Sequence, residues 1–541
     1  MATYLNMTIN LILSLLLFLI STKSSADHLT DTFTECLKNQ SDPTFPVTGI
    51  IYTPANSSFS STFHAYIRNP VFDNSTRTKP SLIITPLHVS HIQAAVICAR
   101  KHGLQMRVRS GGHDYEGLSY LSYSPSPFFI LDMFNLRSVD VNIEQETVWV
   151  QIGATLGEVY YRIAEKSNVH GLPGGVCPTV AVGGHCSGGG YGNMVRKFGL
   201  TVDLIFDALL VDVNGALLDR ASMGEELFWA ITGGGGASFG VILAFGFELA
   251  RVPPKVTVFN VKRTSEENIT NIAYKWFQVA HKLDNELFIR MSFDVVNNTE
   301  GMKNIRASFP SLFLGNSTRL LSLMDNSFPE LGLNESDCVE MSWIESTLVY
   351  AEFPVGTPVE ALLSRVQQPE RDRPFKIKSD FLKEPISRKG LKSIFKKMKE
   401  LENQMVTFSP LSGRMEEISE FAKPFPHRAG NIAMIEYETY WNQTGTKAAN
   451  KYREFSRMMQ EHMTPYVSKN PREAFFNYRD LDNGVNHHGM NSYEEGMVYG
   501  LRYFKEVNYN RLVMVKTMVD PDNFFKDEQS IPPLQSSYEV I

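Results

Sequence analysis

Three glycine-rich segments constrain the fold of this chain more than any other feature. The longest stretch runs from 171 to 192 and includes Gly183–Gly192 (GGHCSGGGYG), where no helical or strand period continues. The two shorter segments are Arg109–Gly112 (RSGG) and Gly233–Gly240 (GGGGASFG). Glycine permits positive φ angles and lets backbone N–H groups approach an anion closely. The three segments therefore predict turns that can cradle phosphate groups.

The sequence around these segments excludes several common folds. No G-x-G-x-x-G follows a strand, opens a helix and meets an acidic residue at the spacing of a Rossmann site. The chain also lacks a Walker loop and the G-x-S-x-G elbow of α/β-hydrolases. Three glycine loops in one lobe favour a dinucleotide held along its whole length by the backbone.

The first half of the chain alternates between strand and helix patterns. Gly103 is predicted to end the first helix, and the loop that begins at Ser110 follows the next strand. The predicted strands are Ser81–Thr85, Leu104–Arg109, Phe129–Met133 and Thr147–Gly153, and the predicted helices are His88–His102 and Thr155–Lys166.

The pattern changes at about Pro254. Thr257–Arg263 and Phe288–Val296 alternate like strands of an antiparallel sheet, with amphipathic helices near Ile269–Leu283, Leu391–Glu402 and Ala448–Met463. A chain of 541 residues is too long for one simple core. We therefore expect an α+β protein with a ligand-binding lobe and a second lobe, in which helices back an antiparallel sheet.

The N-terminus has the features of a secretory signal peptide. An apolar run at 9–20 is too short to span a bilayer comfortably and is followed by small residues up to Ala26, although the start of the chain lacks Lys and Arg. An uncleaved anchor is the alternative. Secretion is also favoured by eight glycosylation sequons in the chain after the predicted signal peptide, at Asn39, Asn56, Asn74, Asn268, Asn297, Asn316, Asn334 and Asn442.

The five cysteines and the charge narrow the chemistry further. Cys36 and Cys98 are the better disulfide candidates because both lie outside the glycine-rich region, whereas Cys177 lies in a Pro/Gly loop where a thiol can face a ligand. The spacing from Cys177 to His185 and Cys186 lacks a second ligand pair, so no metal site is expected. A net charge of −6 argues against a nucleic-acid partner.

Several motifs together resemble the plant berberine bridge enzyme-like flavoproteins. They are Arg109–Gly117 (RSGGHDYEG), Cys177–Val180 (CPTV) with the glycines of 183–192, Asn477–Asp482 (NYRDLD), and the closing stretch Asp520–Pro533. The resemblance covers nearly all of the chain after the predicted signal peptide. The local sequences at His88–Ala94 (HVSHIQA) and Pro424–Gly430 (PFPHRAG) are most similar to those of cannabinoid synthases and their mulberry-family relatives.

This resemblance implies a specific domain organisation. After the signal peptide (1–26), residues 27–75 would begin the FAD lobe and 76–251 would form a PCMH-type FAD-binding domain of two subdomains. Residues 252–475 would form the substrate lobe, and 476–541 would return to the FAD lobe.

The resemblance also implies FAD attached through two covalent bonds, from His113 to the flavin 8α-methyl group and from Cys177 to flavin C6. Imidazole and thiolate are nucleophiles suited to an electron-poor flavin ring. A double tether is expected to raise the reduction potential of the ring. The cofactor-binding residues implied are Arg109, Ser110, Gly111, Gly112, His113, Asp114, Cys177, Thr179, Val180, Gly183, Gly184, His185, Gly188, Tyr191, Gly192, Gly240, Val241 and Asn477.

Two of these residues carry particular expectations. His185 matches the family histidine near the flavin N1–C2=O edge, where a donor would stabilise charge on the reduced ring. Val180 matches the position at which the family places valine when oxygen reaches the flavin, and leucine or isoleucine when it does not. The chain therefore resembles an oxidase, unless Val180 serves only in packing.

Three residues are candidates for work on the substrate. Tyr478 matches the tyrosine proposed as base in cannabinoid synthases, and Glu436 matches the catalytic glutamate of berberine bridge enzyme. Monolignol-oxidising members have lysine where this chain has Met434, which argues against a lignin-alcohol substrate. Arg290 shares a strand face with Ser292 and could anchor a phenolate or polarise a carbonyl. A solvated surface role is open for each candidate.

We expect a secreted or vacuolar FAD-linked oxidase of plant specialised metabolism. Its substrate would be a small phenolic or alkaloid molecule. Hydride would leave an allylic or benzylic carbon of a prenylated phenol, or the carbon beside an alkaloid nitrogen, and O2 would become H2O2. One alternative is a FAD-containing Diels–Alderase that joins a diene and a chalcone without net redox chemistry, with Arg290 activating the chalcone carbonyl. A further alternative is a carbohydrate oxidase. We expect a monomer without a membrane anchor after signal cleavage.

Overall fold

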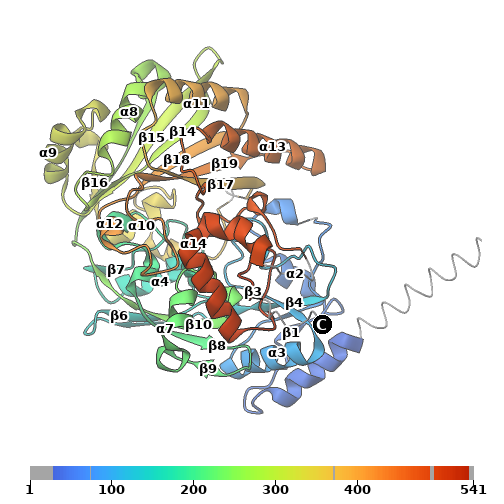
Figure 1. The fold of residues 1–541 in the computed structure, drawn as a ribbon. Helices are drawn as coiled ribbons and strands as arrows, with labels where there is room; N and C mark the ends of the chain where they lie inside the picture. The colour runs from blue at the N-terminus through green and yellow to red at the C-terminus, as the bar shows by residue number, and fades with distance from the viewer. Residues whose placement is uncertain (1–27, 74, 369–371, 488–492, 535–541) are drawn as a thin grey trace, which may run out of the picture.

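The computed structural model describes residues 28–73, 75–368, 372–487 and 493–534. The predicted signal peptide, 1–26, and the sequon at Asn74 lie outside the described residues. Figure 1 shows two lobes, with the glycine-rich first half of the chain in one and a broad sheet covered by helices in the other. This arrangement confirms the predicted α+β class.

The first lobe begins with a small mixed sheet in the order β1-β2-β4-β3. Strands β2, β4 and β3 are parallel, and β1 pairs antiparallel with β2. Helix α3 (Val89–His102) ends at Gly103, whose φ of 65° is the left-handed conformation that glycine adopts at helix ends. The elements are β1 (Ile51–Tyr52), α2 (Phe59–His64), β2 (Leu82–Ile84), β3 (Gln105–Arg109) and β4 (Phe128–Asp132).

A second sheet of the first lobe is antiparallel, in the order β5-β6-β10-β8-β9. Nearly every residue of its central strand β10 is buried, which explains the continuous apolar run at 241–247. The elements are β5 (Val139–Asn142), β6 (Thr147–Gln151), α4 (Leu156–Ala164), β7 (His170–Gly171), α5 (Val182–Ser187), α6 (Val195–Phe198), β8 (Ile205–Val211), β9 (Leu217–Leu218), α7 (Arg220–Ile231), β10 (Val241–Glu248) and β11 (Ala250–Arg251).

The second lobe is built on one large antiparallel sheet in the order β16-β12-β15-β14-β18-β19-β17, with β13 also paired to β15. The strand predicted over 288–296 is interrupted at Arg290, between β13 and β14. The strands are β12 (Val256–Thr264), β13 (Leu287–Ile289), β14 (Met291–Asn297), β15 (Lys303–Phe313), β16 (Val339–Met341), β17 (Phe375–Leu382), β18 (Gln404–Pro410) and β19 (Ala433–Tyr440).

Helices α8, α11 and α13 cover one face of this sheet, as Figure 1 shows. Side chains alternate along the strands, so Met291, Phe293, Val406, Phe408 and Ile435 enter the core beneath these helices. The opposite face is left to the cavity described below. The helices are α8 (Ile269–Val279), α9 (Ser317–Ser327), α10 (Trp343–Tyr350), α11 (Arg388–Glu400), α12 (Arg414–Glu417) and α13 (Thr446–Met463).

The C-terminal part of the chain crosses back to the first lobe. Helix α14 (Tyr493–Val519) contacts α7, and the red segment in Figure 1 lies against the first lobe. A buried ionic network holds the start of this return segment: Asp480 accepts hydrogen bonds from Lys376 at 2.7 Å and from Lys378 at 2.6 Å. Lys376 also contacts Glu116 of the first lobe. The network joins three separate parts of the chain directly behind the cavity.

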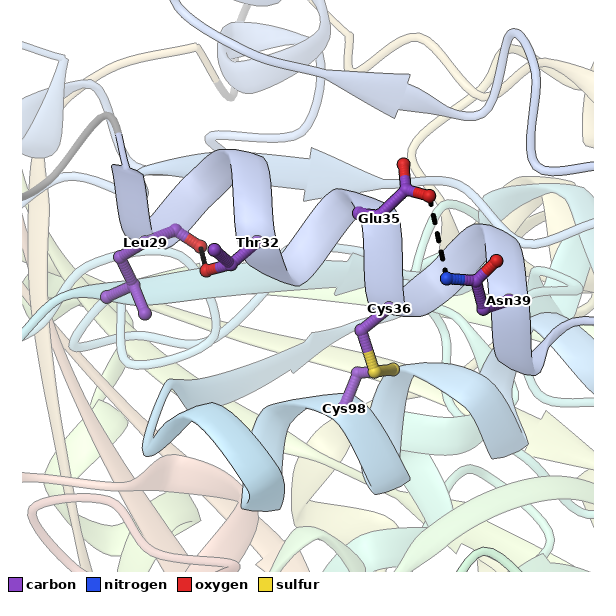
Figure 2. Close-up of a disulfide and its surroundings, with 6 residues drawn as sticks. All are labelled: Leu29, Thr32, Glu35, Cys36, Asn39 and Cys98. Carbon is purple, nitrogen blue, oxygen red and sulfur yellow. Dashed lines mark hydrogen bonds between the residues drawn. A yellow bond between two sulfur atoms is a disulfide. The ribbon is translucent and has the colours of Figure 1, made fainter.

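One disulfide joins Cys36 and Cys98, as predicted (Figure 2). Cys36 lies on the N-terminal helix at 28–40 and Cys98 lies on the buried face of α3. The bond therefore ties the first described helix to helix α3. Cys177, Cys186 and Cys338 are free thiols.

The structure also places the glycosylation sequons. Each of the seven sequon asparagines in the described part of the chain is exposed. Among the described residues, no helix is both long and apolar enough to cross a membrane.

Candidate active site

A cavity of about 930 Å³ lies between the two lobes. One wall consists of the glycine-rich loops at 110–115, 175–187 and 236–240. The other wall is the face of the large sheet opposite α8, α11 and α13, which contributes Arg290, Ser292, Thr407, Glu436 and Glu438. Residues far apart in the sequence therefore meet in one chamber.

The two predicted attachment residues lie beside the same hydroxyl group. His113 Nε2 is 3.0 Å from Thr179 Oγ1, and Cys177 Sγ is 3.6 Å from the same atom. Both residues line the cavity, although 64 positions separate them in the chain. The thiol and the imidazole can therefore reach one planar group from two neighbouring loops.

Glycine is required where these loops pack against other backbone. Gly112 has a φ of 70°, and a Cβ atom there would lie 1.9 Å from the Tyr66 carbonyl oxygen. A Cβ atom on Gly183 would lie 2.7 Å from Ser110 Oγ. The loop at Gly112 therefore packs against the Tyr66 backbone, and the loop at Gly183 packs against Ser110, at positions where a Cβ atom would force neighbouring atoms to move.

Most of the residues predicted to bind the cofactor do line the cavity. Five of them do not, and these act from behind the wall or in its packing. The residues that line it are Ser110, Gly111, Gly112, His113, Asp114, Cys177, Val180, Gly183, Gly184, His185, Tyr191, Gly240 and Asn477. The five others are Arg109, Thr179, Gly188, Gly192 and Val241.

Arg109 is the clearest of these five. Its guanidinium group is fully buried and binds Asp132, with Nη2 to Oδ2 at 2.6 Å, and it also donates to the carbonyls of Thr62 and Phe63. All of these partners are protein groups. The residue supports the loop that begins at Ser110, while Thr179 holds the two attachment side chains in place.

The hydrogen bonds of His185 define its tautomer. The Thr201 hydroxyl donates to the Pro173 carbonyl at 2.6 Å, so His185 Nε2 must carry the proton in its 2.8 Å bond to Thr201. Burial lowers the pKa of His185 to about 4, and the ring is neutral at physiological pH. Nδ1 can then only accept a hydrogen bond, whereas the resemblance implies a donor.

Three tyrosines surround the carboxyl group of Glu436. Tyr478 lies 2.7 Å from Tyr191, hydroxyl to hydroxyl, and its ring stacks on that of Tyr115 with 5.6 Å between centroids. The Tyr115 hydroxyl donates to Glu436 Oε1 at 3.3 Å. Asn477 secures this corner because its Nδ2 donates to the His185 carbonyl at 2.8 Å.

The protonation states in this corner follow from burial and charge. Burial and the neighbouring Glu438 raise the pKa of Glu436 to about 8, against the opposing effects of Arg290, Tyr478 and Tyr115. Burial and the charge of Glu436 hold the pKa of Tyr478 well above its usual value. Glu436 can therefore gain and lose a proton near neutral pH, while Tyr478 keeps its proton.

Arg290 supplies the positive charge of the corner. Its Nε donates to Ser409 Oγ at 3.2 Å, and no described residue accepts a hydrogen bond from its Nη groups. Although burial opposes it, the neighbouring Tyr191, Tyr478 and Glu436 raise the pKa of Arg290. The predicted pairing of Arg290 and Ser292 on one face is confirmed, because both line the cavity.

Sequence reasoning missed four residues that line the cavity: Tyr115, Thr407, Glu438 and Tyr440. Tyr115 stood within the matched loop motif without an assigned role. Glu438 accepts hydrogen bonds of 3.1 Å from Thr407 and from Tyr440. The two-residue strand period places Glu438 and Tyr440 on the same face as Glu436, so the alternation at 436–440 was the available signal.

These observations fit a flavin dinucleotide. Three glycine-rich loops line the cavity, and its wall offers a thiol and an imidazole that both contact the Thr179 hydroxyl. The fold, together with this thiol and imidazole, defines the class of the protein as a FAD-binding oxidoreductase. Comparison with known proteins identifies the family.

Two family models match the chain, "FAD binding domain" over residues 80–220 and "Berberine and berberine like" over 474–532. Berberine bridge enzyme-like 8 of Arabidopsis thaliana is 52% identical over 97% of this chain and 99% of its own length. The chain therefore belongs to the berberine bridge enzyme-like family.

Solved structures agree with this assignment. Berberine bridge enzyme from Eschscholzia californica aligns with a TM-score of 0.86 and 39% identity, over 93% of this chain and 99% of the other. The grass pollen allergen Phl p 4, a glucose dehydrogenase, aligns with a TM-score of 0.87 and 40% identity over 93% and 100%. A variant of Phl p 4 with one isoleucine replaced by valine is a glucose oxidase.

Proposed function

We propose that this protein is a secreted FAD-linked oxidase that acts on a hydroxylated small molecule, a phenol or an alcohol. The observation that carries the proposal is the position of Glu436, an ionisable carboxyl group inside the cavity among three tyrosines and Arg290. Bound FAD supplies a two-electron acceptor for a hydride from the substrate carbon.

Glu436 is the proposed general base. As hydride leaves the carbon, the substrate O–H must lose its proton, and a carboxylate with a raised pKa accepts it near neutral pH. Tyr115 donates to Glu436 and holds the carboxylate in one orientation. Arg290 lies beside them and can stabilise negative charge that develops on the substrate oxygen.

Tyr478 has a different proposed role from that of a base. Its raised pKa keeps the phenol protonated, so it can donate a hydrogen bond to the substrate oxygen but cannot remove a proton at neutral pH. Tyr191 lies within hydrogen-bond distance of Tyr478 and fixes its hydroxyl. The base and the orienting donor are thereby separate residues.

We also propose bicovalent attachment of FAD to His113 and Cys177. Their shared contact with the Thr179 hydroxyl supports this proposal, because both nucleophiles then face the same part of the cavity. The attachment would hold the flavin ring rigidly between the loops and the Tyr478 corner.

Use of oxygen as the electron acceptor is the third part of the proposal. Val180 lines the cavity close to the attachment loop. In Phl p 4, one valine in place of isoleucine accompanies the change from glucose dehydrogenase to glucose oxidase. With valine here, O2 would receive the two electrons and two protons removed from the substrate and become H2O2.

Secretion is proposed from the apolar N-terminal run, the disulfide and the exposed sequons. The apoplast and the vacuole are both consistent with these features. The described residues that line the cavity all come from one chain, so a monomer is proposed as the active form.

Anaerobic mixing tests the oxidase proposal. The FAD-loaded protein would be mixed with prenylated phenols, benzylic alcohols, benzylisoquinoline amines and simple sugars while the flavin absorbance is followed. Bleaching by a phenol or an alcohol, reversed by air with formation of H2O2, is expected. Persistent yellow colour with every member of the panel would contradict the proposal.

A second candidate function, a cycloaddition without net redox chemistry, is favoured by one residue, Arg290. Its Nη groups have no acceptor among the described residues and lie at the cavity wall, where they could polarise the carbonyl of a chalcone. Such activation would accelerate a [4+2] cycloaddition with a diene. Adduct formation without bleaching, abolished by Arg290→Ala at unchanged FAD content, would establish this function instead of oxidation.

A further inference from the structure

Arg68 is a buried cation at the cavity wall that sequence analysis did not single out. The residue is only 7% exposed and lines the cavity. Among the described residues, its guanidinium group forms no salt bridge with a carboxylate. Buried charges in proteins are normally paired, because removing a charge from water is costly. An anionic group is therefore expected close to Arg68.

The two arginines nearest in charge to Arg68 each bind a carboxylate of their own. Arg109 binds Asp132 at 2.6 Å. Arg365 binds Glu158 at 3.2 Å. Burial lowers the pKa of Arg68, and the charges of Arg365 and Arg109 lower it further. The neighbouring cations thus increase the need for a counter-charge at Arg68.

Backbone carbonyl groups fix two of the three guanidinium nitrogens. Nε of Arg68 donates to Gly111 O at 3.3 Å, and Nη2 donates to Arg365 O at 2.9 Å. No described residue accepts a hydrogen bond from Nη1. The Tyr66 ring centre lies 5.3 Å from the guanidinium carbon, but burial raises the pKa of Tyr66, so the phenol is neutral at physiological pH. Tyr66 therefore offers a ring face and no negative charge.

The contact with Gly111 places Arg68 beside the loop of Cys177. Gly111 packs against this loop, because a Cβ atom there would lie 2.8 Å from Ala181 N and 3.3 Å from Thr179 O. The Cys177 thiol contacts Thr179 and lines the same cavity as Arg68. Among the neighbouring charges, a thiolate at Cys177 raises the pKa of Arg68 the most. Cys177 is therefore the acid that can supply the counter-charge.

We propose that Arg68 activates Cys177 for covalent attachment of FAD, by stabilising the thiolate that forms the bond to flavin C6. The inference rests on the proposed attachment of FAD at two residues. The thiolate is the nucleophilic form of cysteine, and a neighbouring arginine favours it. An imidazole is a nucleophile in its neutral form, so attachment at His113 does not need this cation.

The attachment step needs an electron acceptor. The S–H bond of Cys177 and the C6–H bond of the flavin break, and the Sγ–C6 bond forms. Two protons and two electrons are released by this exchange, and they pass to O2, which becomes H2O2. Oxygen is the acceptor already proposed for this site, so the step requires no other reagent.

Substitutions at Arg68 that remove or keep the charge test the proposal. Arg68→Gln keeps an amide donor for Gly111 O without the charge, whereas Arg68→Lys keeps the charge. Each protein would be purified in air at about pH 6, well below the ionisation of an ordinary thiol. Mass spectrometry of tryptic peptides would then give the fractions of Cys177 and of His113 that carry flavin.

The two links should respond differently to loss of the charge. In Arg68→Gln the fraction linked at Cys177 should be about tenfold lower, the change that about one pH unit in thiol ionisation brings. Arg68→Lys should keep most of this link. The His113 link in the same samples should remain, which shows that each variant has folded around FAD. Arg306→Gln, at another part of the cavity wall, is the control and should keep both links.

Incubation in air at about pH 9 gives a second readout, because an ordinary thiol ionises near pH 8.5 without help. The Cys177 link of Arg68→Gln should then rise toward that of the unaltered protein, which a purely structural role of Arg68 would not produce. A full Cys177 link in Arg68→Gln before incubation would overturn the proposal. An equal loss in Arg68→Lys, or a loss that alkaline incubation leaves unchanged, would also overturn it.

This inference and the proposed functions fail separately. Absence of the Cys177 link from the unaltered protein would contradict attachment at two residues and, with it, the role of Arg68. Equal links in the unaltered protein and in Arg68→Gln would contradict the role of Arg68 alone. A link that depends on Arg68, in a protein whose flavin no member of the substrate panel bleaches, would support this inference and contradict the oxidase.

Discussion

His113 and Cys177 both contact a single hydroxyl group, that of Thr179, at 3.0 Å and 3.6 Å. The relationship matters because two covalent bonds to one planar ring require both nucleophiles to be held in position. A threonine between them restrains both side chains without occupying the cavity itself.

The first prediction concerns attachment of the cofactor. His113→Ala and Cys177→Ala should each retain FAD through the remaining residue, and the double variant should release all of it on denaturation. Thr179→Val should reduce the fraction attached twice, because the hydroxyl that orients both side chains is lost. Mass spectrometry of tryptic peptides and flavin fluorescence in denaturing gels would show this. Release of FAD from either single variant would contradict attachment at two residues.

The second prediction concerns the base. Glu436→Gln should lower kcat/KM by about 10² to 10⁴, the range expected for general base catalysis. In the unaltered protein kcat/KM should rise with pH through about 8, since Glu436 must be ionised to accept the proton. Tyr478→Phe should lower kcat but keep this rising limb. Loss of the limb in Tyr478→Phe with retention in Glu436→Gln would assign the base to Tyr478.

The third prediction concerns Glu438, which is held in place by Thr407 and Tyr440. Its negative charge raises the pKa of Glu436, after burial the largest cause of the shift. Glu438→Gln removes that charge, so the rising limb of kcat/KM should move to lower pH. Glu400→Gln on α11 is the control, because that carboxylate is exposed on the outer face. An unchanged limb in Glu438→Gln would show that Glu438 does not act on the base.

Much of the fold could be predicted from local patterns. The helix at 88–102 and its end at Gly103 follow from periodicity and the conformational freedom of glycine, and the structure places α3 at Val89–His102. Alternation predicted strands near β12 and β14. The short helix α5 within the glycine-rich stretch was not predicted, because glycine obscures helical periodicity.

The site was less accessible to sequence reasoning. Motifs identified His113 and Cys177, but their shared contact with Thr179 depends on how two loops fold over each other. Arg109 belongs to the same motif, yet its charge is used by Asp132 behind the cavity. Alternation along one strand could have placed Glu438 beside Glu436, but the contacts of both residues with Thr407, and of Thr407 with Ser292, depend on the register between strands, which a two-residue period alone cannot define.

The fourth prediction concerns oxygen. Val180→Ile adds a methylene group to the cavity wall and should slow reoxidation by O2, while reduction of the flavin by substrate stays close to the rate of the unaltered protein. Stopped-flow spectroscopy with O2 and with an artificial dye would separate the two half-reactions. Val349→Ile provides the same change elsewhere in the cavity. Equal slowing with O2 and with dye would mean that Val180 does not control access of oxygen.

The last prediction concerns the link between the lobes. Although burial opposes it, Lys376 and Lys378 hold the pKa of Asp480 below its usual value. A lowered pKa in the folded state adds stability above the unfolded pKa, near 4, and this stability is lost as pH falls. Asp480→Asn removes the buried negative charge that pairs with Lys376 and Lys378. The change should lower the free energy of unfolding by about 3–5 kcal/mol. Denaturant titrations at pH 7 and at about pH 2.5, well below the unfolded pKa, should show a smaller loss at the lower pH, whereas Asp325→Asn on the exposed side of α9 should change neither. A loss that is equal at both pH values would show that the charge of Asp480 does not stabilise the junction.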